Sequence, residues 1–299
     1  MAWRTRTKTS STPTCWLSLR PEIALKRGGD RRLLSKVPSG VYDRIDNALY
    51  DTESEAWWQP DSAFHQMKHV FNPVRVGYAK RKLFDDLKID PLGKKALEVG
   101  CGGGILSEEI ARMGFDATGI DPSEPSVRTA FDHARVSGLK IRYLKGVGES
   151  LPFPDDSYDV VFCCDVLEHV RDLPNVVSEI SRVLKKGGVF CYDTFNRTLI
   201  SKLVAIKIGQ EWKPWAFLPA DLHVWKMFIK PRELKTLLRK NDLEWKEHQG
   251  IKPNISIPRI LRCLRQRAGG RMSYRELGEK IRMVEGRSRA VMYMGYAVK

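Results

Sequence analysis

A glycine-rich turn between an apolar strand and a helix constrains the fold of this chain more than any other segment. The turn is Gly100-Cys101-Gly102-Gly103-Gly104, with a buried strand predicted over 96–99 and a helix over 105–113. Glycines let the backbone approach a ligand closely, and the free N–H groups at the start of a helix favour polar or anionic groups. Asp121 ends the next predicted strand about 20 residues later, where a carboxylate accepts hydrogen bonds from ribose hydroxyls. These residues predict a nucleotide-type site.

The chain that follows this turn alternates short apolar runs with helical stretches. Such alternation is typical of an α/β fold, a doubly wound parallel sheet with right-handed crossovers and helices on both faces. Ligands of such sheets bind at the carboxyl ends of the strands, where Gly100, Gly102, Asp121 and Cys164 all lie. The predicted strands are 96–99, 116–120, 141–144, 160–164, 189–193, 243–250 and 290–298, and the predicted helices are 105–113, 125–137, 175–184 and 231–240, the third of them ended by Gly187-Gly188.

Charge separates the two flanks of the chain from its centre. Residues 1–40 carry nine Lys or Arg against two acids, and residues 252–289 carry eleven against three, which together account for the whole net charge of +15. We expect 1–40 to be a disordered extension or to contain an upstream start, with an organellar transit peptide as the alternative. Residues 41–90 predict a helical cap rich in aromatic side chains. The main domain is expected over 91–299, with an insertion at 197–230 and a basic helical segment at 252–289.

Cysteine usage and hydropathy indicate the compartment. The six cysteines are scattered and show no paired CxxC pattern of the zinc-binding type, which indicates reduced thiols in an intracellular protein. No stretch approaches the roughly 20 apolar residues that are needed to span a bilayer. We therefore expect a cytoplasmic protein, or one of the mitochondrial matrix if residues 1–40 are a transit peptide.

Five elements in a fixed order decide between families that share such a glycine turn. The turn alone would suit an NAD-dependent dehydrogenase equally well. It is followed by Gly119-Ile120-Asp121, Glu149-Ser150-Leu151-Pro152-Phe153-Pro154, Asp159-Val160-Val161 and Leu184-Lys185-Lys186-Gly187-Gly188. This series resembles the class I S-adenosylmethionine-dependent methyltransferases. The resemblance implies a Rossmann-like sheet with an antiparallel last strand and S-adenosylmethionine as the cofactor.

Four further segments resemble the ubiquinone-biosynthesis O-methyltransferases, over roughly residues 46–251 and 293–298. They are Asn72-Pro73-Val74-Arg75-Val76-Gly77-Tyr78, Asp165-Val166-Leu167-Glu168-His169-Val170, Phe195-Asn196-Arg197 and Phe228-Ile229-Lys230-Pro231-Arg232-Glu233-Leu234. The resemblance implies that the cofactor is bound by Arg75, Gly100, Asp121 and Cys164.

Two of the expected cofactor contacts leave alternatives open. The planar guanidinium of Arg75 suits the methionine carboxylate of the cofactor, and pairing with a nearby acid is the alternative. Glu149 is expected to hydrogen-bond near the adenine, and capping a loop turn is its alternative.

Candidates for the methyl-transfer chemistry follow the fourth predicted strand. A phenol has an unperturbed pKa of about 10, so a base or a metal ion that favours the phenolate would assist the transfer. Asp165, Glu168 and His169 lie at spacings i, i+3 and i+4, on one side of a helical turn. Such ligands would suit Mg²⁺, and in the resembling family an acid-x-x-Glu-His set is associated with metal binding. The alternatives are a purely structural role or, for His169, direct base catalysis. His223 in the insertion is a second catalytic candidate, with a structural histidine as its alternative.

The inserted segment and the basic flank indicate which kinds of partner the protein could contact. Apolar residues over 199–208 are accompanied by Lys202 and Lys207 and followed by tryptophans, a pattern that predicts membrane-surface contact, a lid over the site, or both. The arginines of 252–289 would attract anionic lipid headgroups. Basic clusters also suit nucleic acid, but the Asn-Pro-Pro-Tyr signature of base methylation is absent, and Asp193-Thr194-Phe195-Asn196 stands in its place. A nucleic-acid partner is therefore disfavoured.

These observations favour an O-methyltransferase that acts on a hydroxyl of a polyprenylated catechol or phenol at a membrane surface. The first alternative is a methyltransferase for another small-molecule acceptor. The second is a non-catalytic, membrane-associated protein that binds the cofactor.

Overall fold

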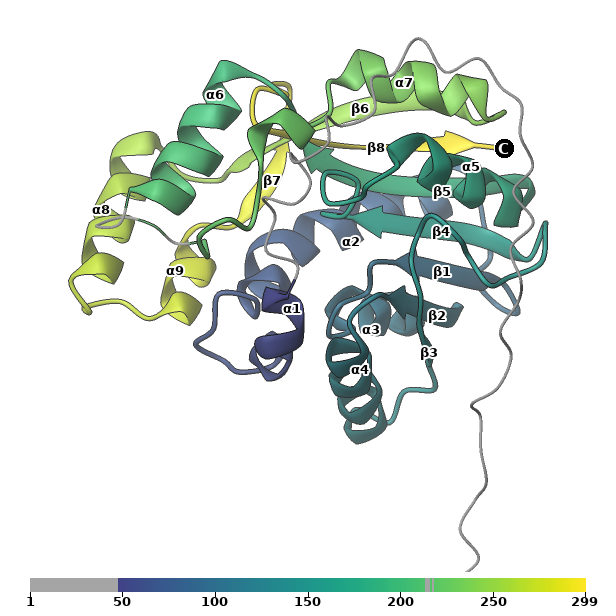
Figure 1. Ribbon diagram of the computed structural model, residues 1–299, viewed down its shortest axis with the longest axis horizontal. Helices are drawn as coiled ribbons and strands as arrows, with labels where there is room; N and C mark the ends of the chain where they lie inside the picture. Colours follow the sequence, from purple (N-terminus) through teal and green to yellow (C-terminus); the bar gives the residue numbers. More distant parts are fainter. Residues whose placement is uncertain (1–47, 213–215, 217) are drawn as a thin grey trace, which may run out of the picture. The chain divides into compact units, whose positions relative to one another are not determined.

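A computed structural model describes residues 48–212, 216 and 218–299. The expectations for residues 1–40, and for 41–47 of the predicted helical cap, lie outside the described residues. Within them, eight strands form one sheet in the order β3-β2-β1-β4-β5-β8-β6-β7 (Figure 1). The strands are β1 (Lys95–Val99), β2 (Asp116–Asp121), β3 (Arg142–Lys145), β4 (Tyr158–Cys164), β5 (Leu184–Phe195), β6 (Glu244–Pro253), β7 (Met283–Gly286) and β8 (Met292–Val298).

Helical segments connect the strands, and those labelled η have 3₁₀ or π geometry. They are α1 (Leu49–Thr52), η2 (Ser54–Trp57), η3 (Met67–Phe71), α2 (Asn72–Lys80), η4 (Arg81–Asp86), α3 (Ile105–Arg112), α4 (Glu124–Val136), α5 (Leu173–Val183), α6 (Leu199–Ser201), η5 (Lys202–Glu211), η6 (Trp225–Met227), α7 (Pro231–Lys240), α8 (Ile257–Ala268) and α9 (Tyr274–Lys280). The part of the chain that the structure describes contains no helix long and apolar enough to cross a membrane.

The centre of the sheet is parallel, because β1 pairs in parallel with β2 and β4, β2 with β3, and β4 with β5. Successive residues of β4 enter opposite cores, as the period of two in a strand requires. Val161 and Cys163 pack with α5 and α7, whereas Val160 and Phe162 pack with η4, α3 and α4. Helices therefore cover both faces, which confirms the doubly wound fold.

The other end of the sheet is antiparallel. β8 lies between β5 and β6 and runs antiparallel to both, which confirms the expected antiparallel last strand. β7 adds an edge strand along β6. The expected basic helical segment over 252–289 contains α8 and α9, but the expectation is wrong at 252–253 and at Met283–Gly286, which pair with each other as parts of β6 and β7.

Two further expectations about helices agree with the structure. The helix predicted over 175–184 is α5, which ends one residue earlier, at Val183, because the backbone of Leu184 is extended and pairs with Tyr158 of β4. The predicted cap consists, from residue 48 onward, of short helical pieces with a turn at Pro60, which lacks the N–H that a continuous helix needs.

Candidate functional site

The glycine turn folds as the site requires. Gly100 and Cys101 donate their N–H groups to the carbonyl oxygen of Ile120 at 2.8 and 3.1 Å, which ties the turn to the end of β2. Gly100, Gly102 and Gly104 all have positive φ, at 76°, 48° and 81°. A Cβ on Gly100 would lie 2.3 Å from a methyl carbon of Val166. Close packing and backbone conformation therefore both require glycine at position 100.

Asp121 closes the turn from the end of β2. Its Oδ2 accepts a hydrogen bond from the N–H of Gly102 at 2.8 Å, and its Oδ1 accepts one from the N–H of Ser123 at 2.9 Å. Each carboxylate oxygen has a second lone pair, so both remain able to accept from a diol. Burial raises the pKa of Asp121 to about 6, partly offset by these two amides.

One cavity of about 540 Å³ connects the turn with the inserted segment. The expected cofactor residues Arg75, Gly100, Gly102, Asp121, Glu149 and Cys164 line it, together with the chemistry candidates Asp165, His169 and His223. Apolar side chains complete the lining: Phe64, Met67, Phe71, Phe195, Leu218 and Leu222. A single space thus adjoins both the glycine turn and the two histidines.

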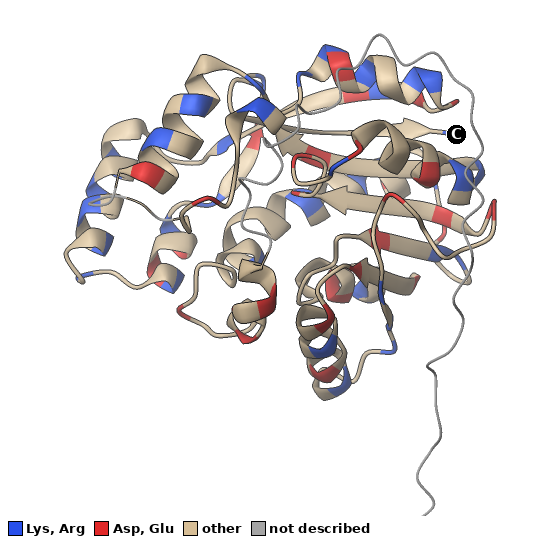
Figure 2. Cartoon of the chain, viewed as in Figure 1, with Lys and Arg blue, Asp and Glu red and all other residues tan. Residues whose placement is uncertain are grey.

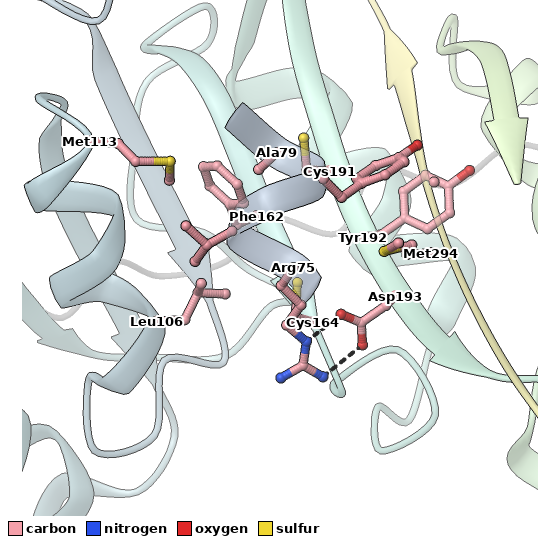
Figure 3. Close-up of a pocket in the computed structure, with 13 residues that line it drawn as sticks. Arg75, Ala79, Leu106, Met113, Phe162, Cys164, Cys191, Tyr192, Asp193 and Met294 are labelled. Atoms are coloured by element: carbon pink, nitrogen blue, oxygen red, sulfur yellow. Dashed lines mark hydrogen bonds and ion pairs between the residues drawn. The ribbon is translucent and has the colours of Figure 1, made fainter. Parts of the chain in front are cut away.

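Arg75 is held by two carboxylates at the ends of β4 and β5. Its Nε donates to Asp193 Oδ2 at 2.6 Å and its Nη2 donates to Asp193 Oδ1 at 2.9 Å (Figure 3). Nη2 also contacts Asp165. Burial opposes the charge, but Asp165 and Asp193 raise the pKa of Arg75 well above its ordinary value. The alternative of acid pairing therefore describes these bonds. Nη1 takes part in none of them, and the expected contact of Arg75 with the cofactor carboxylate stays a prediction.

Removal of this arginine should destabilise the protein strongly. In Arg75→Met, Asp193, which has no exposed surface, and Asp165 lose their cation, and breaking a buried pair costs about 3–5 kcal/mol. Arg81→Met is the matched control, because its pair with Glu285 is partly exposed and is worth about 1 kcal/mol or less. Urea unfolding of the cofactor-free variants measures the difference, and equal losses would contradict this account of Arg75.

Cys164 and Asp165 occupy the carboxyl end of β4. Cys164 lies in register with Asp193, and the backbone N–H of Asp165 donates to Asp193 Oδ1 at 3.1 Å. Asp165 has a backbone φ of 53°, which is uncommon for a residue other than glycine. Residues with such unusual backbone conformations are often found at functional sites. Burial raises the pKa of Asp165 to about 6, against the opposing effect of Arg75.

Glu168, His169 and His223 come together beside the cavity. One ligand atom from each lies within 4.8 Å of the others, and this group does not include Asp165. Glu168 Oε2 accepts a hydrogen bond from Thr194 at 2.7 Å, and within the described residues Glu168 Oε1 and His169 Nδ1 have no hydrogen-bond partner. Burial lowers the pKa of His169 to about 4 and, with Asp165, raises that of Glu168 to about 8.

The predicted magnesium set is not assembled. Asp165 turns to Arg75 instead, and two of the three donors that do meet are imidazole nitrogens, whereas Mg²⁺ prefers oxygen. The residues that meet here therefore do not fit a magnesium ion.

Glu149 is occupied in the loop before α5. Its Oε1 accepts a hydrogen bond from the N–H of Arg171 at 3.0 Å, and its carbonyl oxygen accepts one from Asn175 at 2.5 Å. This is the alternative role considered for Glu149, although the residue also borders the cavity.

Several residues near the N-terminal end of the described chain lie at or beside the cavity, although the sequence pattern did not indicate them as site residues. Trp57 packs against Gly103, where a Cβ would lie 2.3 Å from its side chain, and Trp58 Nε1 donates to the Gly103 carbonyl at 2.7 Å. Tyr50 stacks on Trp57. Asn72 is buried against the cavity, and among the described residues its Nδ2 has no hydrogen-bond partner. The aromatic density of the cap was the available signal for the tryptophans.

Comparisons with known proteins agree with this geometry. Residues 97–192 match the family model described as a methyltransferase domain. The ubiquinone biosynthesis O-methyltransferase of Pelagibacter ubique is 38% identical over 68% of this chain and 85% of its own length, and that of Caulobacter vibrioides is 37% identical over 68% and 82%. Among solved structures, an S-adenosylmethionine-dependent methyltransferase of Thermotoga maritima covers 87% of this chain and 98% of its own, with a TM-score of 0.52 and 18% identity.

The solved structure supports the fold alone, whereas the curated relatives and the family model decide between the nucleotide-binding families in favour of S-adenosylmethionine as cofactor. The expectation of a methyltransferase is confirmed, and a dehydrogenase is excluded. The chain therefore belongs to the S-adenosylmethionine-dependent methyltransferases, in the family of the ubiquinone biosynthesis O-methyltransferases.

Proposed function

We propose that this protein transfers the methyl group of S-adenosylmethionine to a phenolic hydroxyl of a polyprenylated catechol. The observation that carries the proposal is the single cavity lined by Asp121 and the glycine turn, by His169 and His223, and by aromatic side chains. The names of the curated relatives support O-methylation in ubiquinone biosynthesis.

The reaction is an in-line displacement that needs little from the protein beyond orientation and exclusion of water. The new O–CH₃ bond forms as the S–CH₃ bond breaks, the bonding pair passes to sulfur, and S-adenosylhomocysteine leaves. The phenolic proton passes to an uncharged imidazole, for which His223 and His169 are the candidates, because their ring centroids lie 4.9 Å apart beside the cavity. Burial keeps the pKa of each below its ordinary value, so both are in the basic form near neutral pH.

The apolar part of the cavity supports an aromatic acceptor with a hydrocarbon tail. Phe71 and Phe195 border it together with Leu218 and Leu222, all of which favour an apolar ring and chain over a highly polar small molecule. Within this lining Asn72 supplies a donor that has no partner among the residues that the structure describes, and it suits an oxygen of the bound ligands.

The test is a comparison of acceptors. We expect a higher kcat/KM for a prenylated catechol in detergent or vesicles than for the same catechol without its tail. A preference for the water-soluble catechol would favour another small-molecule acceptor. Tight binding of S-adenosylmethionine without turnover on any phenol would favour the non-catalytic alternative.

We also propose that the inserted segment contacts the membrane surface, where a prenylated acceptor resides. Leu199, Ile200, Leu203 and Val204 of α6 and η5 are exposed, although Ala205 and Ile206 on the same segment are buried. Lys202 and Lys207 are exposed beside them. Ile208 packs with Cys263 and Leu264 of α8, so the apolar surface adjoins this helix. Arg259, Arg262 and Arg265 of α8 are exposed, and Figure 2 shows basic residues along the helix. Apolar residues flanked by such cations suit an anionic lipid surface.

Membrane contact predicts a specific loss in vesicle flotation. Leu199→Glu/Leu203→Glu removes two side chains that are 78% and 56% exposed, and it should reduce the fraction that floats with anionic vesicles severalfold without lowering the melting temperature. Leu92→Glu is the control, because Leu92 is 83% exposed but lies in the loop before β1. Equal flotation of the two variants would contradict the membrane proposal.

A further inference from the structure

Gln210 and His223 form a local hydrogen-bonded unit within the insertion. Gln210 is buried, and its Nε2 donates to the carbonyl oxygen of His223 at 3.2 Å. Its Oε1 accepts from the backbone N–H of His223 at 2.9 Å and lies 2.8 Å from His223 Nδ1. Three hydrogen bonds thus join one amide side chain to one histidine.

The backbone of His223 determines which way the amide of Gln210 points. A carbonyl oxygen only accepts and a backbone N–H only donates, so Nε2 must face the former and Oε1 the latter. The reverse orientation would place donor against donor and acceptor against acceptor in a buried site, at a cost in each contact. The amide orientation therefore follows from its partners.

The orientation of the amide in turn determines the tautomer of His223. Oε1 can only accept, so the ring nitrogen 2.8 Å from it, Nδ1, must carry the hydrogen. A neutral imidazole has a single N–H, which leaves the lone pair on Nε2. Phe195 and Phe228 pack around the ring, with centroids 4.8 and 6.0 Å away, and limit its rotation.

The Nε2 of His223 is therefore the nitrogen left for the cavity, where His223 lies with His169 and near Glu168. We propose that Gln210 is a positioning residue for methyl transfer. It holds His223 in the tautomer in which Nε2 can take the proton of the substrate hydroxyl. The inference rests on the proposed function. Gln210 itself is absent from the cavity lining, so it acts through His223 alone.

The test compares Gln210→Met with Gln249→Met. Both changes remove an amide that donates to a backbone carbonyl, but that carbonyl belongs to His223 for Gln210 and to Gly286, at 2.9 Å, for Gln249. We expect Gln210→Met to lower kcat about 10–100-fold, similar to the loss when the hydrogen-bond partner that orients a metal-ligating histidine is removed, with an unchanged KM for S-adenosylmethionine. Wild-type kcat in Gln210→Met, or an equal loss in Gln249→Met, would overturn the proposal.

A spectroscopic readout separates this role from simple structural damage. Long-range ¹H–¹⁵N correlation spectra should show His223 with a protonated Nδ1. The signals of His223 are identified by their absence from the spectrum of His223→Phe. In Gln210→Met, the tautomer population of His223 should shift toward a protonated Nε2. Gln210→Glu keeps an acceptor oxygen and should keep the proton on Nδ1, which provides a second variant if Gln210→Met fails to fold. A neutral ring with its only proton on Nε2, in the wild type or in Gln210→Glu, would contradict the assignment. These spectra need no acceptor, so they decide the role of Gln210 even if no catechol is methylated and the proposed function fails.

Discussion

Asp121→Asn should weaken the binding of S-adenosylmethionine by about 10–100-fold, the value of one charge-assisted pair of hydrogen bonds. One carboxylate holds the N–H groups of both Gly102 and Ser123 and remains able to accept from a ribose. The asparagine side chain has the same shape but one acceptor oxygen and no charge. Titration calorimetry with S-adenosylmethionine and S-adenosylhomocysteine measures the loss, and an unchanged Kd would contradict the ribose assignment.

The same residue predicts a pH dependence. Because burial raises the pKa of Asp121 to about 6 in the free protein, the accepting carboxylate form is lost as the pH falls below 6. Cofactor affinity should therefore fall between pH 7 and pH 5 in the wild type, and this part of the dependence should be missing in Asp121→Asn. A wild-type affinity that rises on acidification would contradict the assignment.

Gly100→Ala should remove cofactor binding and lower stability by several kcal/mol. The residue has φ of 76°, which costs a side chain about 1–2 kcal/mol, and its Cβ would lie 2.3 Å from Val166, which adds an overpacking cost of about 1–3 kcal/mol. The turn cannot yield easily, because the N–H of Gly100 is bonded to Ile120. Thermal unfolding and calorimetry measure the two effects.

Gly187→Ala is a matched control for that prediction. Gly187 has the same φ of 76°, but among the described residues a Cβ there would meet no atom within 4 Å. It should therefore lose only the backbone part, about 1–2 kcal/mol, and keep cofactor binding. Val166→Ala combined with Gly100→Ala should recover part of the stability, and an absence of recovery would show that the clash with Val166 is not the cause.

The parallel half of the fold could be predicted from the sequence because its signals are local. The sequence pattern predicts the apolar run of β1, the glycine turn and the acid at the end of β2, each from a few neighbouring residues. Likewise α7 begins at Pro231 and ends at Lys240, as predicted. β7 could not be predicted, since its four residues depend on pairing with β6, far away in the chain.

Contacts between distant side chains were likewise beyond the sequence pattern. Spacing alone predicted that Asp165 lies with Glu168 and His169. In the structure Asp165 instead pairs with Arg75, which lies 90 residues earlier in the chain. The third member of the group is His223, from the insertion. The bonds of Gln210 to His223 depend on the fold of the insertion, and no periodicity predicts them.

The most direct test of the central claim uses S-adenosylmethionine labelled with ¹³C in its methyl group and a prenylated catechol in vesicles. Mass spectrometry and NMR of the product should show one labelled methyl ether on the catechol for each S-adenosylhomocysteine released. Label on a carbon or nitrogen atom, or release of S-adenosylhomocysteine without a labelled catechol, would contradict the assignment of this cavity to O-methylation.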